Sequence, residues 1–271
     1  MAAPRRRPVL GQHFLTDRRI LKRIVDALEP DPSDVVIEIG AGQGTLTRAL
    51  TPRVGRVIAI EKDARLTARV GDEGRGKGEG LRVVTGDALR LDWHQLLQET
   101  LPPSLVPRPF KVIGNIPYAI TSPLIDKALT PPLPERIVFL VQSEVADRLA
   151  ARPGSKPYGA LSVGVQAVCR VERLFAVAAG AFRPPPRVRS ALVRLHPLDP
   201  PLVSAAALPG FRAFVSACFG FRRKQLVNVL RTVTGRPADA VSSWLSSHGI
   251  EPRQRPETLT PEQFVRLFGW R

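Results

Sequence analysis

Short apolar runs alternate with stretches of helical spacing along the first half of the chain. The apolar runs predict strands that are buried on both faces, at residues 35–39, 56–60, 81–85, 110–113 and 137–141. Apolar residues between these runs recur at helical spacing and predict helices at residues 18–28, 45–50, 63–70, 93–101, 123–129 and 143–150. Strands that alternate with helices form a mostly parallel sheet covered on both faces, so we expect an α/β fold.

The first predicted helix has an apolar face and a basic face. Asp17 is a plausible N-cap for this helix. Its apolar positions are Ile20, Leu21, Ile24, Val25 and Leu28. Its basic positions are Arg18, Arg19, Lys22 and Arg23. Such a pattern is typical of a helix that is buried on one side only.

The pattern changes in the second half of the chain. Residues 163–177 and 188–195 are expected to be extended on either side of Phe182-Arg183-Pro184-Pro185-Pro186, so the sheet should end in an antiparallel pair. Residues 197–209 are expected to form a linker, and residues 211–271 to be helical throughout.

We therefore expect two domains. Residues 1–197 should hold the sheet, and residues 198–271 should form a small all-helical domain. The Gly-rich tract at residues 71–80 is expected to be a flexible loop, and no function is assigned to it.

The net charge of the chain indicates what kind of molecule it binds. The 271 residues carry a formal net charge of +16, from 40 Lys and Arg against 24 Asp and Glu. This excess favours a polyanionic partner, with nucleic acid ahead of an anionic membrane. Genomic base composition can explain why most of the basic residues are arginines, but it does not explain the shortage of acids. Residues 180–271 alone hold 14 basic and 5 acidic residues.

The cysteines and the apolar runs bear on the compartment. Cys169 and Cys218 are far apart and form no CxxC pair, which suggests neither a disulfide framework nor a zinc site, and no metal is expected. The arginines at residues 5–7 are not followed by the apolar region of a signal peptide. No apolar run approaches the ~20 residues that span a bilayer. We expect a cytoplasmic protein with no membrane contact.

A glycine-rich turn follows the first predicted strand. Glu38-Ile39-Gly40-Ala41-Gly42-Gln43-Gly44 places the turn between a strand and a helix, where backbone amides face a nucleotide-type ligand. The spacing is G-x-G-x-G, and Thr45 stands where the dinucleotide fingerprint has Gly or Ala. This weakens the case for a nicotinamide cofactor and fits S-adenosylmethionine better, because S-adenosylmethionine has no pyrophosphate.

Two acids end the next two predicted strands. Glu61 lies about 20 residues after the turn, where an acid can accept both ribose hydroxyls. Asp87 ends the third strand and can accept from the adenine amino group. Each acid alone is slightly more often an ordinary surface carboxylate. Together with Gly40 and Gly42 they occupy successive strand ends on one rim, which favours the cofactor interpretation.

The fourth predicted strand leads into Asn115-Ile116-Pro117-Tyr118. The lone pair of an adenine N6 is delocalised into the ring, so a methyltransferase must hold and polarise this amine. The Asn115 side-chain oxygen and the Ile116 carbonyl can each accept one N6–H bond, and Tyr118 can stack on the base. Phe182 is a candidate for a second stacking ring. The alternative for Phe182 is a core residue before a proline turn.

These motifs, taken in order, resemble the KsgA family of small-subunit ribosomal RNA adenine dimethyltransferases. The similar segments are GQHFL at 11–15, EIGAGQGTLT at 38–47, GDAL at 86–89, NIPY at 115–118, KPYGxLS at 156–162, FxPxPxVxS at 182–190, FGFRRK at 219–224 and RPETLTPEQFVRL at 255–267. His13 stands where the family often has Asn, a mild departure. The resemblance covers nearly the whole chain, and the ordered set is highly specific.

The resemblance implies a Rossmann-like class I S-adenosylmethionine-dependent methyltransferase. It implies that residues 1–197 bind S-adenosylmethionine and catalyse, and that residues 198–271 contribute to rRNA binding. The implied cofactor-binding residues are Gln12, His13, Leu15, Gly40, Gly42, Glu61, Asp87, Ala88 and Asn115. The expected catalytic residues are Asn115, Ile116, Pro117, Tyr118 and Phe182.

The resemblance also implies the substrate. Two adjacent adenines in the 3′-terminal hairpin loop of small-subunit (16S) rRNA would each receive two methyl groups on N6, and the protein would act in late small-subunit assembly.

Three basic residues in a row are usually a solvated helix face. Arg222, Arg223 and Lys224 follow Phe219 and Phe221 in a basic region, so we expect them to contact rRNA phosphates. The expected partner is the small ribosomal subunit, bound by a monomer.

Three alternatives stay open on the sequence alone. An Erm-like large-subunit rRNA adenine methyltransferase would share the catalytic domain, but the FRRK and RPETLTPEQF segments argue against it. A small-molecule methyltransferase is disfavoured by the net charge. A non-enzymatic assembly factor is disfavoured because Asn115, Tyr118 and the cofactor acids are intact.

Overall fold

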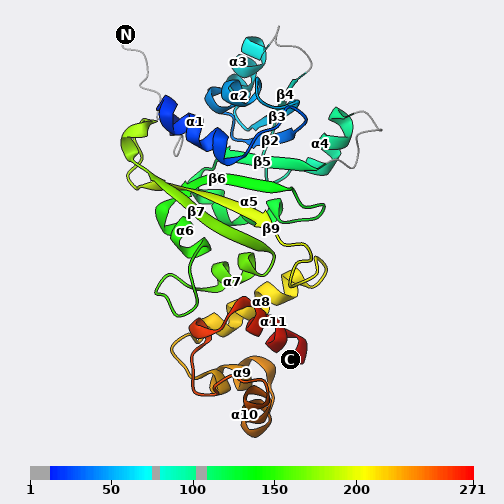
Figure 1. The fold of residues 1–271 in the computed structure, drawn as a ribbon, viewed down its shortest axis with the longest axis vertical. Coiled ribbons are helices and arrows are strands. Elements are labelled where there is room, and N and C mark those ends of the chain that lie inside the picture. The colour runs from blue at the N-terminus through cyan, green and yellow to red at the C-terminus, as the bar shows by residue number, and fades with distance from the viewer. Residues whose placement is uncertain (1–12, 75–79, 102–108) are drawn as a thin grey trace, which may run out of the picture. The chain divides into compact units, whose positions relative to one another are not determined.

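The computed structural model describes residues 13–74, 80–101 and 109–271 of the chain. The main feature of this described part is one seven-stranded sheet, whose strands are drawn as arrows (Figure 1). The strand order is β4–β3–β2–β5–β6–β9–β7. The strands are β2 (Val35–Ile39), β3 (Arg56–Glu61), β4 (Leu81–Thr85), β5 (Phe110–Asn115), β6 (Arg136–Gln142), β7 (Cys169–Val177) and β9 (Ser190–Pro197). The pairs from β4 to β6 are parallel, which confirms the expected α/β sheet.

The strand order reverses at β2. Strands β3 and β4 lie on one side of β2, and β5 and β6 lie on the other. Ile39 pairs with Ile60 on one side and with Gly114 on the other, so Gly40 follows level with Glu61 and Asn115. Open α/β sheets bind their ligands at such a switch point, beyond the carboxyl ends of the strands.

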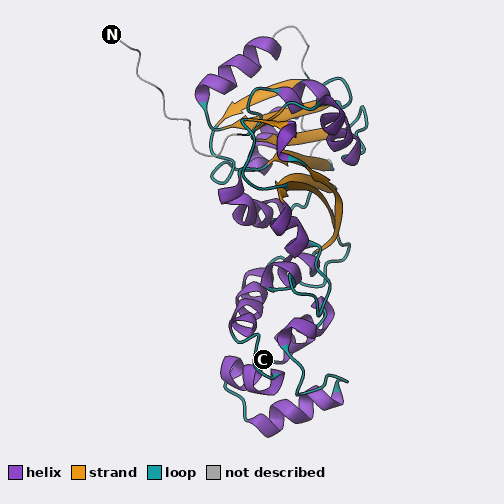
Figure 2. Ribbon diagram, turned by 90° about the vertical axis from the view of Figure 1, so that its left-hand side faces the viewer, coloured by secondary structure: helices purple, strands orange, loops and turns teal. Residues whose placement is uncertain are grey.

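Helices lie on both faces of the parallel part of the sheet (Figure 2). They are α1 (Arg18–Ala27), α2 (Thr45–Leu50), α3 (Ala64–Gly74), α4 (Trp93–Thr100) and α5 (Thr121–Ala128), with the short 3-10 turn η2 (Tyr118–Ile120) before α5. Asp17 caps α1 as expected, accepting from the backbone amides of Arg19 and Ile20. The apolar face of α1 supplies Ile24, Val25 and Leu28 to the core, where burial drives its docking.

A two-stranded antiparallel sheet joins the N-terminal segment to the proline-rich segment. It pairs β1 (Phe14–Leu15) with β8 (Phe182–Arg183), so that Leu15 lies opposite Phe182. The 3-10 turn η3 (Ala179–Ala181) precedes β8, and the Ala181 carbonyl accepts from the Thr16 amide at 2.8 Å. Two segments that are far apart in sequence are thereby held side by side.

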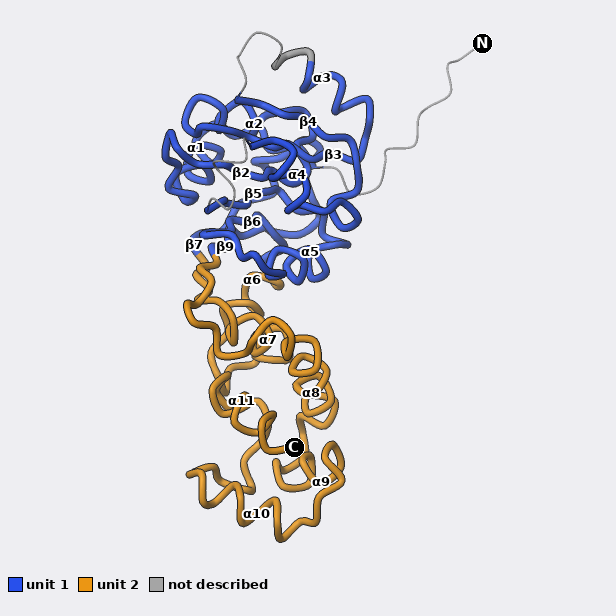
Figure 3. Tube along the Cα trace, turned by 90° about the vertical axis from the view of Figure 1, so that its right-hand side faces the viewer, with its two compact units in different colours: residues 1–143, 174–194 blue, residues 144–173, 195–271 orange. Residues whose placement is uncertain are grey.

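The chain forms two compact units (Figure 3). One comprises residues 1–143 and 174–194, and the other comprises residues 144–173 and 195–271. The second unit is mostly helical, with α6 (Ser143–Leu149), α7 (Ala160–Gln166), α8 (Leu208–Gly220), α9 (Leu226–Thr234), α10 (Ala238–Ser247), η4 (Pro256–Thr258) and α11 (Pro261–Trp270). This division differs from the expected boundary after residue 197, and the separate functions of the two domains stay predictions.

Two expectations about local structure are wrong. The extended segment was expected to begin at residue 163, but residues 163–166 belong to helix α7. This helix packs against α8, and the packing overrides the strand preference of Val163 and Val165. The Ser162 hydroxyl accepts from the Gly159 amide at 3.1 Å and so caps the start of α7. Helix α3 continues to Gly74, into the expected loop, while residues 75–79 lie outside the described part.

Among the helices of residues 13–74, 80–101 and 109–271, none has the length and hydrophobicity of a membrane-spanning segment.

Candidate active site

A cavity opens at the carboxyl ends of β2, β3, β4 and β5, and the predicted site residues gather around it. Its walls are His13, Phe14, Ile39, Gly40, Gly42, Ile60, Glu61, Lys62, Gly86, Asp87, Ala88, Asn115, Ile116, Pro117, Tyr118 and Ile120. The residues singled out at four successive strand ends therefore do line one space. Gln12 lies outside the described residues.

The glycine turn after β2 has a backbone that only glycine adopts without strain. Gly40, Gly42 and Gly44 have φ angles of 73°, 56° and 74°. A Cβ on Gly42 would lie 3.1 Å from the Phe14 ring, so a side chain there would also crowd the cavity wall. The Gly40 amide donates to the Ile60 carbonyl at 2.8 Å, which ties the turn to β3.

The Glu61 carboxylate anchors this turn, a role that the sequence did not reveal. Its Oε2 accepts from the Gly42 amide at 2.9 Å, and its Oε1 accepts from the Asp63 amide at 2.9 Å. Glu61 is 8% exposed. A carboxylate oxygen can accept more than one hydrogen bond, so Glu61 can hold the turn and still bind ribose hydroxyls.

Asp87 lies on the same rim and is held by a cation. Its Oδ2 accepts from the Lys62 ammonium at 2.9 Å, and its Oδ1 accepts from the Leu89 amide at 3.0 Å. The hydrogen bond from Lys62 lowers the pKa of Asp87 below its ordinary value. Asp87 is therefore an ionised acceptor at neutral pH, which suits recognition of an exocyclic amino group.

The Asn115 amide has a fixed orientation. Its Nδ2 donates to the His13 carbonyl at 2.9 Å. A carbonyl oxygen only accepts, so the nitrogen must face His13, and the Asn115 Oδ1 is left as an acceptor at the cavity. Ile116 is 1% exposed, and its amide donates to the Leu140 carbonyl at 3.1 Å, which fixes the backbone beyond the strand.

The Tyr118 ring is held by the segment after the proline-rich turn. Its hydroxyl and the Ser190 hydroxyl share a hydrogen bond of 2.9 Å, and Ser190 is 1% exposed. The Tyr118 ring also lies 6.1 Å from the His13 imidazole, centroid to centroid. His13 Nδ1 donates to the Pro184 carbonyl at 2.8 Å. Ser190 ends the FxPxPxVxS segment, but nothing in the sequence indicated that it contacts Tyr118.

Phe182 and Leu15 do not line this cavity. Phe182 is 1% exposed and belongs to the hydrophobic core, together with Leu15 opposite it in the small sheet. The expectation of a second stacking ring at Phe182 is thus not met by this structure. The alternative of a core phenylalanine before a proline turn describes its position, because β8 turns the ring inward.

Glu38 is a buried acid beneath the glycine turn. It is 0% exposed, and the hydroxyl and amide of Thr47 are polar groups beside its carboxylate. Burial raises the pKa of Glu38 to about 7, because the ionised form loses its hydration.

The basic residues expected to contact rRNA lie in the second unit, on the turn between α8 and α9. Arg222, Arg223 and Lys224 are all exposed, and the Arg222 guanidinium pairs with the Glu257 carboxylate at 2.7 Å. The neighbouring Phe221 side chain is 43% exposed.

The open parallel sheet, the glycine turn and the strand-end acids define the class I methyltransferase fold. A sequence model of the ribosomal RNA adenine dimethylase family matches residues 4–271, and the chain belongs to this family. The family resemblance predicted from the motifs is thereby confirmed, as are the fold class and the class of enzyme.

Named relatives share most of their length with this chain. The ribosomal RNA small subunit methyltransferase A of Nitrosococcus oceani is 40% identical over 264 residues, covering 97% of this chain and 95% of that protein. The protein of the same name from Xanthomonas campestris pv. campestris is 42% identical over 259 residues, covering 95% and 93%.

Two solved structures show the same fold over nearly the whole chain. A dimethyladenosine transferase from Plasmodium falciparum has a TM-score of 0.79 and 28% identity, covering 94% of this chain and 96% of that one. The 23S rRNA methyltransferase ErmE has a TM-score of 0.74 and 31% identity, covering 94% and 98%.

Proposed function

We propose that the protein transfers methyl groups from S-adenosylmethionine to N6 of two adjacent adenines in the 3′-terminal hairpin loop of 16S rRNA, giving N6,N6-dimethyladenosine. The observation that carries the proposal is the pairing of a fixed amide acceptor, Asn115 Oδ1, with the Tyr118 ring on one cavity wall. The names of the relatives at 40–42% identity support the small subunit as substrate.

The cavity fits S-adenosylmethionine on structural grounds. The glycine turn leaves out the Cβ atoms that would fill its floor, Glu61 can accept from ribose hydroxyls, and Asp87 can accept from the adenine amino group. When bound, this cofactor supplies an electrophilic methyl group. Ala88 and Gly86 complete the wall on the Asp87 side.

The chain's own contribution is to position the target amine. Asn115 Oδ1 and the Ile116 carbonyl would each accept one N6–H bond, which directs the lone pair away from the ring plane. Pro117 fixes the backbone between these acceptors and Tyr118. Removing an adenine from its stack costs a few kcal/mol, and stacking on Tyr118 returns about 1–3 kcal/mol.

The second unit would supply affinity for the ribosomal particle. Arg223 and Lys224 are exposed cations, and Arg222 shares its charge with Glu257. We infer that they contact rRNA phosphates, so binding should weaken as salt rises. A monomer acting in the cytoplasm on a late small-subunit precursor is part of the same proposal.

The deciding experiment is methyl transfer from labelled S-adenosylmethionine to unmethylated small and large ribosomal subunits, followed by nucleoside mass spectrometry. We expect N6,N6-dimethyladenosine in small-subunit RNA alone. The likeness to ErmE makes the large subunit the necessary comparison, because label there would establish the Erm-like alternative. No label in either particle would refute the proposed substrate.

Asn115→Ala tests the assigned role of the amide. We expect transfer to fall by about 100-fold or more, because removing one preorganised hydrogen-bonding group at a reacting centre, such as an oxyanion-hole donor, costs about 2.7–4 kcal/mol. Binding to small subunits should stay within threefold of the wild type, measured by filter binding on protein with an unchanged melting temperature. Equal loss of binding and transfer would contradict a role in chemistry.

A further inference from the structure

The basic face of α1 has no part in the proposed function, and two of its residues line a groove. The groove lies between α1 and α2 in the first unit, and its basic residues are Arg18, Lys22, Arg48 and Arg53. The apolar side chains of Leu21, Val25 and Ala49 form its floor. None of the described residues that line it is acidic.

Two of the cations of the groove share one acid and remain accessible to solvent. Asp26 binds both Lys22 Nζ, at 2.7 Å, and Arg53 Nη1, at 2.6 Å. One carboxylate is therefore shared between two cations of the groove, Lys22 and Arg53. The Lys22 side chain is 76% exposed and Arg53 is 40% exposed, so an anion can reach both heads from solvent.

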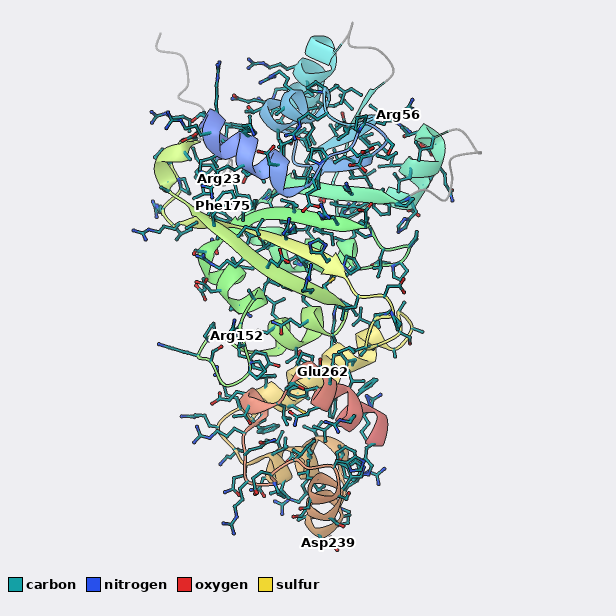
Figure 4. All side chains as sticks on the ribbon, viewed as in Figure 1. Arg23, Arg56, Arg152, Phe175, Asp239 and Glu262 are labelled. Carbon is teal, nitrogen blue, oxygen red and sulfur yellow. The ribbon has the colours of Figure 1, made fainter. Side chains whose placement is uncertain are left out.

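The other two cations of α1 face elsewhere. The Arg23 guanidinium lies 3.7 Å above the centre of the Phe175 ring, on β7 (Figure 4). Arg19 is exposed and does not line the groove. Helix α1 thus carries one basic pair inside the groove, Arg18 and Lys22, and one outside it, Arg19 and Arg23, with the same total charge.

The groove lies beside segments that also wall the cavity. Phe14 lines the cavity and the next residue, Leu15, lines the groove. Thr45, at the start of α2 directly after the glycine turn, also lines the groove. The groove and the cavity are therefore walled by neighbouring residues of the same segments, which places them close together in the first unit.

We propose that the α1–α2 groove binds phosphates of the rRNA strand that flanks the target adenine. This proposal rests on the proposed function and adds to it a second contact surface, on the catalytic unit itself. A concave, basic groove with an apolar floor suits a single sugar–phosphate strand, whose charges lie outside and whose riboses can cover apolar atoms. Its role is to bind and align the substrate, so it should affect affinity and leave the chemical step unchanged.

The test compares two double variants that remove the same charge from the same helix. Arg18→Gln with Lys22→Gln strips two cations from the groove, while Arg19→Gln with Arg23→Gln removes two outside it. Arg48 and Arg53 are left intact, because Arg48 donates to the Gln43 carbonyl of the glycine turn and Arg53 holds Asp26. The readouts are KM and kcat on unmethylated small subunits, the Kd for these subunits, and the Kd for S-adenosylmethionine.

We expect the groove variant to raise KM and Kd for the subunit at least fivefold at 0.1 M salt, with kcat and cofactor affinity unchanged. The slope of log Kd against log salt should fall by about 1.4–1.8, since each lost phosphate contact contributes about 0.7–0.9. The variant at Arg19 and Arg23 should stay within twofold of the wild type.

Equal weakening in both double variants would show only long-range attraction by net charge and would overturn the proposal. An unchanged Kd in the groove variant would do the same and would leave these cations as a solvated face. Failure of the proposed function is a separate result, because it is seen as wild-type protein that forms no dimethyladenosine in small subunits. Direct subunit binding still tests the groove in that case.

Discussion

Ser190→Ala should weaken catalysis indirectly, because Ser190 holds the Tyr118 ring in place. The substitution removes the hydroxyl that bonds to the Tyr118 hydroxyl at 2.9 Å. Ser190 is 1% exposed, so little water can take its place. A hydrogen bond of this kind contributes about 1 kcal/mol net, which corresponds to about a fivefold change in a rate or equilibrium. We expect kcat/KM on small subunits to fall by about fivefold.

A double-mutant cycle separates ring positioning from a general loss of stability. Tyr118→Phe deletes the same bond from the other side but keeps the stacking ring, so it should cost a similar factor. Ser190→Ala made in the Tyr118→Phe background should then cost almost nothing further, giving a coupling of about 1 kcal/mol. Affinity for S-adenosylmethionine should be unchanged in all three variants, because Glu61 and Asp87 keep their partners.

Tyr158→Phe is the matched control. It deletes a buried tyrosine hydroxyl that donates to the Leu259 carbonyl at 2.8 Å, in the second unit and outside the cavity. We expect a lower melting temperature with kcat/KM within twofold. The reasoning is refuted if Ser190→Ala lowers kcat/KM by the same factor with and without the Tyr118 hydroxyl, since the two groups would then act independently.

The buried acid and the close-packed glycine give two further predictions. Burial raises the pKa of Glu38 from 4.5 to about 7. Between these pH values the folded protein holds a proton that the unfolded chain has released. The free energy of unfolding should therefore fall by about 3 kcal/mol as pH rises through this window. Glu38→Gln should flatten this dependence in urea unfolding at pH 5 and pH 8, and an equally steep dependence in the variant would assign it to other groups. A Cβ on Gly114 would lie 2.6 Å from the Ile39 carbonyl oxygen, so Gly114→Ala should cost about 1–3 kcal/mol and lower transfer by displacing Asn115. Gly180→Ala, with nothing within 4 Å of the new Cβ, should be near neutral in both measurements, and equal effects would contradict the steric argument.

The sequence correctly placed those site residues that lie at the ends of strands. Gly40, Glu61, Asp87 and Asn115 each follow a short apolar run, and the carboxyl ends of neighbouring parallel strands meet at one edge. Local spacing was therefore sufficient to bring them around one cavity. Their individual roles in binding and transfer stay predictions.

Contacts that depend on the far edge of the sheet could not be found in this way. Tyr118 and Ser190 are 72 residues apart, and they meet only because β9 lies next to β6. No local pattern specifies that neighbour. Phe182 was misplaced for a related reason, because pairing of β8 with the N-terminal strand, and not the proline turn after it, decides which way its ring points.

Histidine can replace asparagine at position 13 because the contact with Asn115 is made by the backbone carbonyl and not by the side chain. The Asn115 amide is oriented by the His13 backbone carbonyl, which any residue at this position supplies. The imidazole adds a separate bond, from Nδ1 to the Pro184 carbonyl, that ties the N-terminal segment to the proline-rich segment. An asparagine side chain also carries N–H donors and could make the same bond. The N-terminal segment therefore acts through its main chain, by setting the orientation of the Asn115 amide, the proposed acceptor for the target amine, 102 residues away.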